Sequence, residues 1–219
     1  MSDKVDTWIF DLDNTLYSAS SGVFAQIDAR MKAFISHEIG LSLDDAYALQ
    51  KKYFHAHGTT LRGLMLNHNT NPDAFLDFVH DIDHSYLGPD QRLAAAIDAL
   101  PGRKLIYTNA TTYHAERVVD RLKIGHLFDD IFDIRAAEFL PKPDPTPYRK
   151  MINDHVITPN TAAMFEDSSA NLRPAAALGM TTIWVQHPTP AHLDLGSHDH
   201  CHHVTTDITA WLETTARSL

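Results

Sequence analysis

Residues 7–17, TWIFDLDNTLY, are the stretch that decides the fold. The run TWIF is short, apolar and made of β-branched and aromatic residues, and it ends abruptly at the carboxylates Asp11 and Asp13. A buried parallel strand has this pattern when its carboxyl end brings polar side chains to a site. The sequence therefore predicts a central strand near the N-terminus, with Asp11 and Asp13 at the edge of a parallel sheet.

Residues of roughly 16 to 86 have a different pattern, in which apolar residues recur three or four positions apart. This spacing is typical of amphipathic helices. Ser42 with Asp45 resembles a capping box, Gly40 can end the helix before it, and Asn71 precedes a proline at a first helical position. The region is therefore predicted to be an all-helical insertion.

From residue 89 onward, strand-like and helix-like segments alternate. The predicted strands are residues 104–108, 131–134, 162–165 and 181–185, followed by a last short strand and a helix over about 207–215. Alternation of this kind predicts a parallel sheet with helices on both faces. We expect an α/β fold: a Rossmann-like parallel sheet core formed by residues 1–15 and 87–219, with a helical domain inserted at 16–86.

Composition excludes several classes of partner. The chain has 219 residues, of which 44% are hydrophobic, and a formal net charge of -10. This charge disfavours nucleic acid polymers and anionic membranes. No apolar stretch approaches the roughly 20 residues that span a bilayer. The first residues lack the pattern of a signal peptide, and the lone Cys201 fits a reducing compartment. We therefore expect a cytoplasmic protein, either a monomer or a homodimer.

Polar residues follow three of the predicted strands, and a proline-rich segment adds a lysine. The candidate site residues are Asp11, Asp13, Thr108, Asn109, Lys142, Glu166 and Asp167. Ligands of open parallel sheets bind at the carboxyl ends of the strands, so we expect these residues to converge at one edge.

Their chemical types suit phosphoryl transfer. Asp11, Asp13 and Asp167 gather negative charge, which calls for a divalent cation with hard oxygen ligands, Mg²⁺. Lys142, the Thr108 hydroxyl and the amides that follow it can bind phosphate oxygens, so the predicted phosphate-binding residues are Thr108, Asn109 and Lys142. Asp11 would attack phosphorus and form an aspartyl phosphate. Asp13 would protonate the leaving oxygen and then deprotonate the water that opens the intermediate.

Four ordered motifs carry a resemblance to a known family: FDLDNTLY (10–17), IYTNA (106–110), PKPDP (141–145) and FEDSSANL (165–172). They resemble those of the haloacid dehalogenase superfamily, from Phe10 to about Gly179, with the insertion where that superfamily has its C1-type cap. The resemblance implies Asp11 as nucleophile, Asp13 as acid/base, Thr108 and Lys142 as phosphate ligands, and Asp167 as a magnesium ligand. It further implies the Asp13 backbone carbonyl as a metal ligand and Glu166 as a supporting residue.

One position departs from the superfamily pattern. Many members carry a second Asp four residues after the metal-binding Asp167, where this chain has Asn171. The superfamily's dehalogenases lack an acid at the position of Asp13, because halide leaves unprotonated. Asp13 therefore indicates phosphate chemistry.

FDLDNTLY, IYTNA and the stretch HGTTLRGL (57–64) resemble the pyrimidine 5'-nucleotidase branch. This resemblance implies nucleoside monophosphates as substrates, UMP and CMP among them. We expect the loop that contains Thr59 and Arg62 to close over the site and contact the nucleoside.

Other functions stay open. They are a phosphatase for another small metabolite, such as phosphoglycolate or a sugar phosphate, a phosphoglucomutase-like isomerase, and a non-catalytic phosphate-binding module. The histidine-rich segment 198–203 could bind zinc, but such close neighbours rarely all reach one ion, and we expect it to lead only into the last strand and helix.

Overall fold

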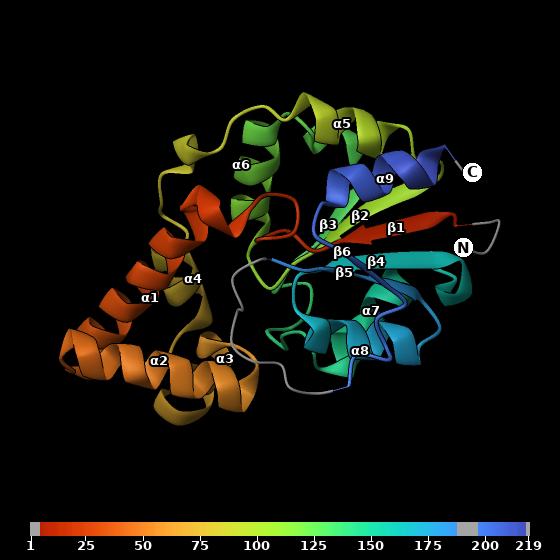
Figure 1. Cartoon of the computed structure of the whole chain (residues 1–219). Helices are drawn as coiled ribbons and strands as arrows, with labels where there is room; N and C mark the ends of the chain where they lie inside the picture. The colour runs from red at the N-terminus through yellow and green to blue at the C-terminus, as the bar shows by residue number, and fades with distance from the viewer. Residues whose placement is uncertain (1–4, 188–196, 218–219) are drawn as a thin grey trace.

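The structure is a computed structural model that describes residues 5–187 and 197–217. Its centre is a sheet of six strands in the order β3-β2-β1-β4-β5-β6 (Figure 1). All neighbouring strands are parallel. The strands are β1 (Thr7–Phe10), β2 (Arg103–Tyr107), β3 (Asp130–Phe132), β4 (Ala162–Glu166), β5 (Thr181–Val185) and β6 (His203–Thr205). The predicted α/β fold is confirmed, with β1 at the centre.

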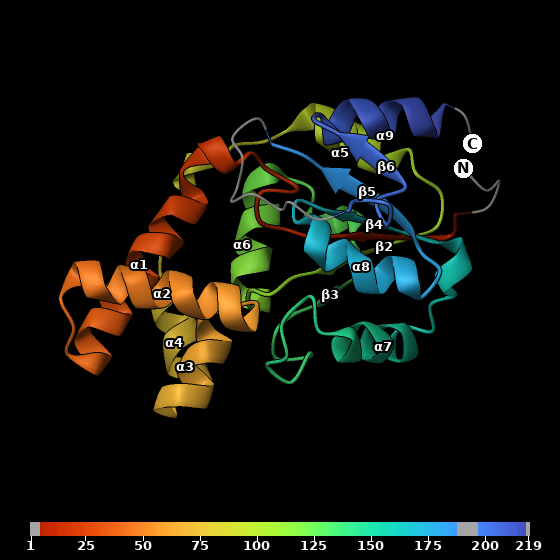
Figure 2. The same cartoon turned by 60° about the horizontal axis from the view of Figure 1, so that its bottom comes forward.

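Helices cover both faces of the sheet. Figures 1 and 2 show α5 (Gln91–Asp98), α6 (Thr112–Leu122) and α9 (Ile208–Ala216) on one face and α7 (Pro145–Asp154) and α8 (Ser169–Ala177) on the other. Four short 3-10 turns are η1 (Ala19–Ser21), η2 (His84–Tyr86), η3 (Gly125–Leu127) and η4 (Pro159–Thr161). No helix among the described residues has both the length and the apolar character to cross a membrane.

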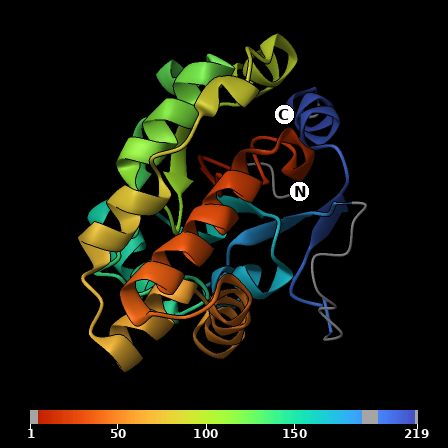
Figure 3. The same ribbon diagram turned by 90° about the vertical axis from the view of Figure 1, so that its left-hand side faces the viewer.

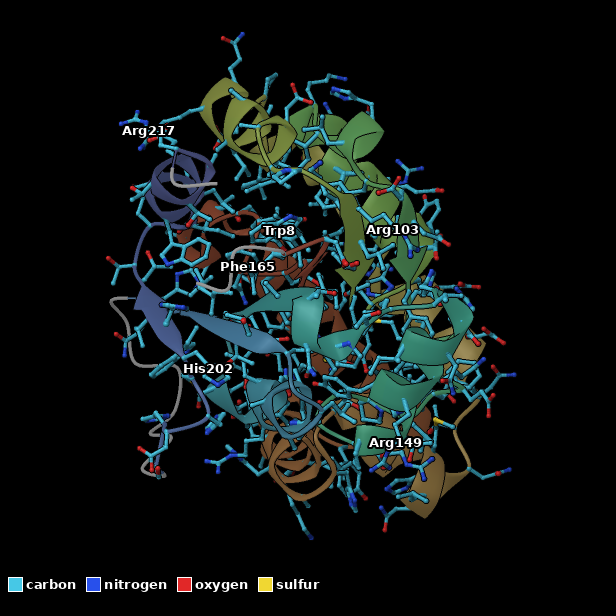
Figure 4. The ribbon with its side chains drawn as sticks, turned by 90° about the vertical axis from the view of Figure 1, so that its right-hand side faces the viewer. Trp8, Arg103, Arg149, Phe165, His202 and Arg217 are labelled. Atoms are coloured by element: carbon cyan, nitrogen blue, oxygen red, sulfur yellow. The ribbon has the colours of Figure 1, made fainter. Side chains whose placement is uncertain are left out.

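Alternate side chains of β1 fill two separate cores, as a pleated strand requires. Trp8 and Phe10 pack on the side of α5 and α9, where the ring of Phe10 stacks on that of Phe165 at a centroid distance of 4.7 Å. Figure 4 shows Trp8 and Phe165 on this side. Ile9 packs in the opposite core, on the side of α7 and α8. With both faces covered, β1 is wholly buried, and the chain leaves the sheet directly into the site.

The first four helices after β1 form the helical insertion: α1 (Val23–Ile39), α2 (Leu43–His57), α3 (Thr60–His68) and α4 (Pro72–Val79). The predicted caps are present, since Ser42 accepts a hydrogen bond from the Asp45 amide and Asn71 accepts from the amides of α4. These helices enclose a hydrophobic cluster of their own. Figure 3 views the molecule from their side. The division at residues 16 and 86 stays a prediction.

Two strands end earlier than predicted, β2 by one residue, at Tyr107, and β3 by two. The sequence indicated a strand to Ile134, but β3 ends at Phe132. The reason is that Ile134 packs into the hydrophobic cluster of the helical insertion, while its amide donates to the carbonyl of Ala110.

Candidate active site

Asp11 stands at the carboxyl end of the central strand. Parallel pairing places Phe10 opposite Phe165 of β4, and the Asp11 amide donates to the Phe165 carbonyl at 2.9 Å. The next residue of β4, Glu166, therefore comes beside Asp11. The Asp11 carboxylate accepts a hydrogen bond from Thr15 Oγ1 at 2.8 Å, and Asp11 is only 6% exposed. The short apolar strand and the carboxylate that follows it thus give a buried, oriented acid.

Lys142 brings a buried positive charge to this acid. Its Nζ lies 2.7 Å from Asp11 Oδ1, 2.6 Å from Glu166 Oε2 and 2.9 Å from the Tyr107 carbonyl oxygen. An ammonium group has three N–H donors, so all three are used. Burial opposes the charged form, but Asp11 and Glu166 outweigh it and raise the pKa of Lys142. Lys142 therefore stays charged beside Asp11.

The segment that carries Lys142 is fixed by Asn109. The side-chain Oδ1 of Asn109 accepts from the Lys142 amide at 2.9 Å. Thr108 is 1% exposed, and its Oγ1 accepts from the Ala110 amide at 2.9 Å, which leaves its own O–H available as a donor. Phosphate binding by Thr108 and Asn109 stays a prediction. The Asn109 side chain has a use that the sequence did not indicate, since it holds the lysine in place.

Three acidic side chains form a group that could hold a metal ion. Asp11, Glu166 and Asp167 each offer an oxygen, and these atoms all lie within 4.8 Å of one another. Burial and the charge of Glu166 raise the pKa of Asp11 to about 7. Burial raises the pKa of Glu166 to about 7 and, together with Asp11, that of Asp167 to about 6. The group has more negative charge than Lys142 balances, and its hard oxygen ligands fit Mg²⁺.

The Asp13 side chain points elsewhere. Its Oδ1 accepts hydrogen bonds from Tyr17 OH and from His114 Nε2, the latter at 2.8 Å. Burial would raise the pKa of Asp13, but His114 and Tyr17 lower it below its usual value. The side chain is not in the acidic group, so the metal role predicted for Asp13 rests on its backbone carbonyl.

Neither Tyr17 nor His114 was among the predicted site residues. Tyr17 belongs to the stretch that decides the fold and lies four residues after Asp13, a spacing at which side chains can meet when the chain turns. His114 is 101 positions from Asp13, and no local pattern indicates that they touch.

The loop between α2 and α3 lies against the lysine segment. A Cβ atom on Gly58 would stand 3.3 Å from the Lys142 carbonyl oxygen and 3.5 Å from Pro143 Cδ. Thr59 caps α3 by accepting from the Arg62 amide at 3.2 Å. Arg62 was predicted to lie in this loop but lies in the first turn of α3, because the helix begins directly after Thr59. Its side chain is half-buried and forms no ion pair with any described residue. Substrate contacts from Thr59 and Arg62 stay predictions.

The histidine-rich segment forms no metal-binding group within the part of the chain that the structure describes. The ring of His198 stacks on Trp184, His200 Nε2 lies 2.7 Å from the Ser169 carbonyl, and His202 contacts Thr182. The three rings thus have separate partners; His202 is labelled in Figure 4.

The fold and the site together define a class of α/β proteins: a parallel sheet with buried carboxylates at the end of its central strand and a helical insertion after it. Residues 5–179 match the family of haloacid dehalogenase-like hydrolases. The chain belongs to this family, and the superfamily predicted from the four motifs is confirmed.

Individual relatives are similar in sequence or in fold. Phosphate metabolism protein 8 of Saccharomyces cerevisiae is 31% identical over 191 residues, which cover 79% of this chain and 59% of the yeast protein. A phosphatase of the family from Thermococcus onnurineus has a TM-score of 0.63 at 14% identity and covers 96% of this chain and 97% of its own. A dehalogenase solved with an intermediate complex has a TM-score of 0.61 at 15% identity, covering 98% of both chains. Because similar folds occur in a phosphatase and a dehalogenase, the site residues must distinguish the reactions.

Proposed function

We propose that the chain is a magnesium-dependent phosphomonoesterase that works through an aspartyl phosphate on Asp11. One observation carries the proposal: Asp11 lies 2.7 Å from Lys142 and within 4.8 Å of Glu166 and Asp167, although these residues are far apart in sequence. A carboxylate nucleophile beside a fixed ammonium group and a cation site suits an anionic phosphate ester.

The first step transfers the phosphoryl group to Asp11. An Asp11 oxygen forms a bond to phosphorus, and the bond from phosphorus to the ester oxygen breaks. Asp13 gives its proton to that oxygen, so the alcohol leaves neutral. Lys142 keeps a positive charge 2.7 Å from Asp11 Oδ1 throughout, which stabilises the anionic phosphoryl group as it arrives. In the second step Asp13 takes a proton from water, the water oxygen bonds to phosphorus, and inorganic phosphate leaves Asp11.

The pKa values of the two aspartates are shifted in opposite directions, and each shift is the reverse of what the first step needs, namely ionised Asp11 and protonated Asp13. Burial raises the pKa of Asp11 to about 7, while His114 lowers that of Asp13 despite its burial. Mg²⁺, held by Asp11, Asp167 and the Asp13 backbone carbonyl, would supply positive charge that favours ionised Asp11 and offsets its repulsion of phosphate. A phosphate dianion beside Asp13 favours protonated Asp13 in turn. Bound substrate and metal together would thus favour ionised Asp11 and protonated Asp13.

For the substrate we propose nucleoside 5'-monophosphates, pyrimidine nucleotides first. The resemblance of residues 57–64 and of two core motifs to the pyrimidine 5'-nucleotidase branch supports this. So does the half-buried Arg62, which has no ion-pair partner among the described residues and follows a loop that lies against the lysine segment. The name of the yeast relative, Phosphate metabolism protein 8, is consistent with a phosphate-releasing activity. A cytoplasmic location and a monomeric or homodimeric state stay predictions.

A phosphate-release screen tests the function. It compares UMP, CMP, purine nucleotides, phosphoglycolate, sugar phosphates and p-nitrophenyl phosphate, each with Mg²⁺ and with a chelator. Fastest release from UMP or CMP supports the proposal, and faster release from another ester supports the metabolite phosphatase. Phosphoryl return to the sugar with little free phosphate indicates the isomerase. Phosphate binding without release from any ester indicates the non-catalytic module.

Replacing Arg62 by Ala tests the role of the cap loop. Losing a charge-assisted contact with the nucleotide should raise KM for UMP by about 10-fold, while KM for p-nitrophenyl phosphate changes less than about 2-fold. Steady-state kinetics on both esters measure this split. Arg149→Ala, an exposed arginine of α7 (Figure 4), is the matched control. Equal losses on both esters would remove the specificity role.

A further inference from the structure

The two oxygens of the Asp13 carboxylate are in different surroundings. Oδ1 accepts from both Tyr17 OH and His114 Nε2. No described residue donates a hydrogen bond to Oδ2, and the Asp13 side chain is 15% exposed, whereas that of His114 is not exposed at all. One oxygen is therefore held by the protein and the other is left for the substrate and for the proton that is transferred.

His114 is itself held by two more histidines. His84 Nε2 lies 3.1 Å from His114 Nδ1. The ring of His80 stacks on that of His114, with 4.8 Å between centroids and 17° between planes. All three rings are buried, with 0% exposure for His114 and 5% for each of the others. Burial lowers the pKa of His80 to about 3 and of His84 to about 4, so these two stay neutral near pH 7. A neutral, packed imidazole is a rigid support.

The supporting residues come from the connections between the sheet and the helical insertion. Tyr17 lies on the outgoing connection, and His80 and His84 lie on the return segment, residues 80–90. Gln26 of α1 ties that segment to the helical insertion, because its amide donates to the Asp83 carbonyl at 2.9 Å and its oxygen accepts from the Asp83 amide at 3.1 Å. The outgoing connection thus contacts Asp13 Oδ1 directly through Tyr17, and the return segment reaches it only through His114.

We propose that His114 is a positioning residue for the acid/base Asp13: it holds Oδ1 so that Oδ2 faces the leaving oxygen, and His80 and His84 hold it in turn. This inference rests on the proposed function. Proton transfer by a well-placed acid contributes roughly 10²–10⁴-fold to a rate, and a misplacement of about 1 Å can remove about 10²-fold. The hydrogen bond between His114 and Asp13 Oδ1 is therefore expected to affect the rate of the chemical step and not substrate binding.

The dependence on the leaving group separates positioning from mere packing. The 5'-hydroxyl of a nucleoside is a weakly acidic alcohol and needs the proton as it leaves, whereas p-nitrophenolate is a stable anion and leaves without it. Uridine and p-nitrophenolate both depart in the first step. A single turnover of UMP and the burst of p-nitrophenolate therefore report that step for each substrate.

Two variants of His114 make the test. His114→Phe keeps a ring against His80 but removes both nitrogens; His114→Gln restores an N–H donor near the position of Nε2. We expect His114→Phe to slow uridine release by about 10–100-fold and the p-nitrophenolate burst by less than about 3-fold. His114→Gln should recover most of the loss. Asp13→Asn is the reference variant, and it should slow uridine release more than the p-nitrophenolate burst, by a larger ratio than His114→Phe does.

A third variant tests the link to the return segment. His84→Phe should show the same split at about 3–10-fold, since His84 acts through His114. The burst amplitude counts active sites, so a partly unfolded variant is recognised. Equal losses on both substrates, or none, in His114→Phe would overturn the inference while leaving the proposed function intact. A silent His84→Phe would overturn the link to the return segment. Wild-type protein that releases phosphate from no ester overturns both.

Discussion

Asp11→Asn is expected to lower phosphate release by at least about 10⁴-fold on every substrate, because an amide cannot attack phosphorus in place of a carboxylate. The loss should be in kcat, while KM changes little. Steady-state phosphate release with p-nitrophenyl phosphate and with UMP measures it. Acid-quenched protein should also carry covalent phosphate in the wild type and none in the variant.

The fold should survive this substitution. Asn Oδ1 can accept from Lys142 as Asp11 does, and its Nδ2 can donate to Thr15 Oγ1 in place of the present bond. Because burial already raises the pKa of Asp11 to about 7, a neutral side chain is tolerated there. We expect the Tm to stay within roughly 5 °C of the wild-type value.

The matched control is Asp98→Asn, an exposed aspartate at the end of α5. It should leave both the rate and the covalent phosphate unchanged. Undiminished release in Asp11→Asn would overturn the nucleophile assignment. If Asp11→Asn lost both phosphate release and its folded thermal profile, the loss of activity would be due to misfolding around Lys142. Asp11→Glu, which keeps a carboxylate beside Lys142, is then expected to retain the fold.

The central part of this site could be predicted because each piece is local. A buried strand that ends in carboxylates is visible in TWIFD, and parallel pairing brings the next residue of β4, Glu166, beside Asp11 once the alternation of strands and helices is recognised. Lys142 follows from the same topology, since its segment leads into the helix before β4. These predictions follow from the hydrophobic pattern of the chain and its period, both of which can be recognised in the sequence.

The support around Asp13 could not be predicted in this way. His114 lies in the first turn of α6, and His80 lies just past the end of α4, so the local pattern gives both only as helix-end residues. Their stacking depends on how the return segment crosses α6, which is set by packing between distant elements. Asn109 illustrates the same limit, because its contact with Lys142 joins residues that are 33 positions apart.

Asp167→Asn should remove the response of the protein to Mg²⁺ and reduce phosphate release by about 10³-fold or more. Its effect on the metal-free protein should have the opposite sign: greater stability. Folding raises the pKa of Asp167 to about 6, through burial and the charge of Asp11. An acid whose pKa rises on folding binds more protons in the folded state than in the unfolded state. Its contribution to stability is therefore present below the pKa of the unfolded state and is lost as pH rises through the pKa of the folded state.

For Asp167 this pH window runs from the ordinary aspartate pKa of 3.8 to about 6, and for Asp11 and Glu166 it extends to a pKa of about 7. The metal-free wild type should therefore lose stability across this range. Asp167→Asn stays neutral, so its Tm should be close to that of the wild type near about pH 4 and exceed it near about pH 8. Asp98→Asn is the control and should show no such divergence.

Added Mg²⁺ completes the test. At 100 times its Kd a ligand stabilises the folded state by about 2.7 kcal/mol, which is roughly 5–10 °C in Tm for a domain of this size. The wild type should gain this near about pH 8, where the carboxylates are charged, and Asp167→Asn should gain little. An undiminished gain in the variant would show that Asp167 does not hold the cation. A metal-free variant less stable than the wild type at that pH would contradict the repulsion among the three acids, because removing one charge from a crowded buried group must relieve the others.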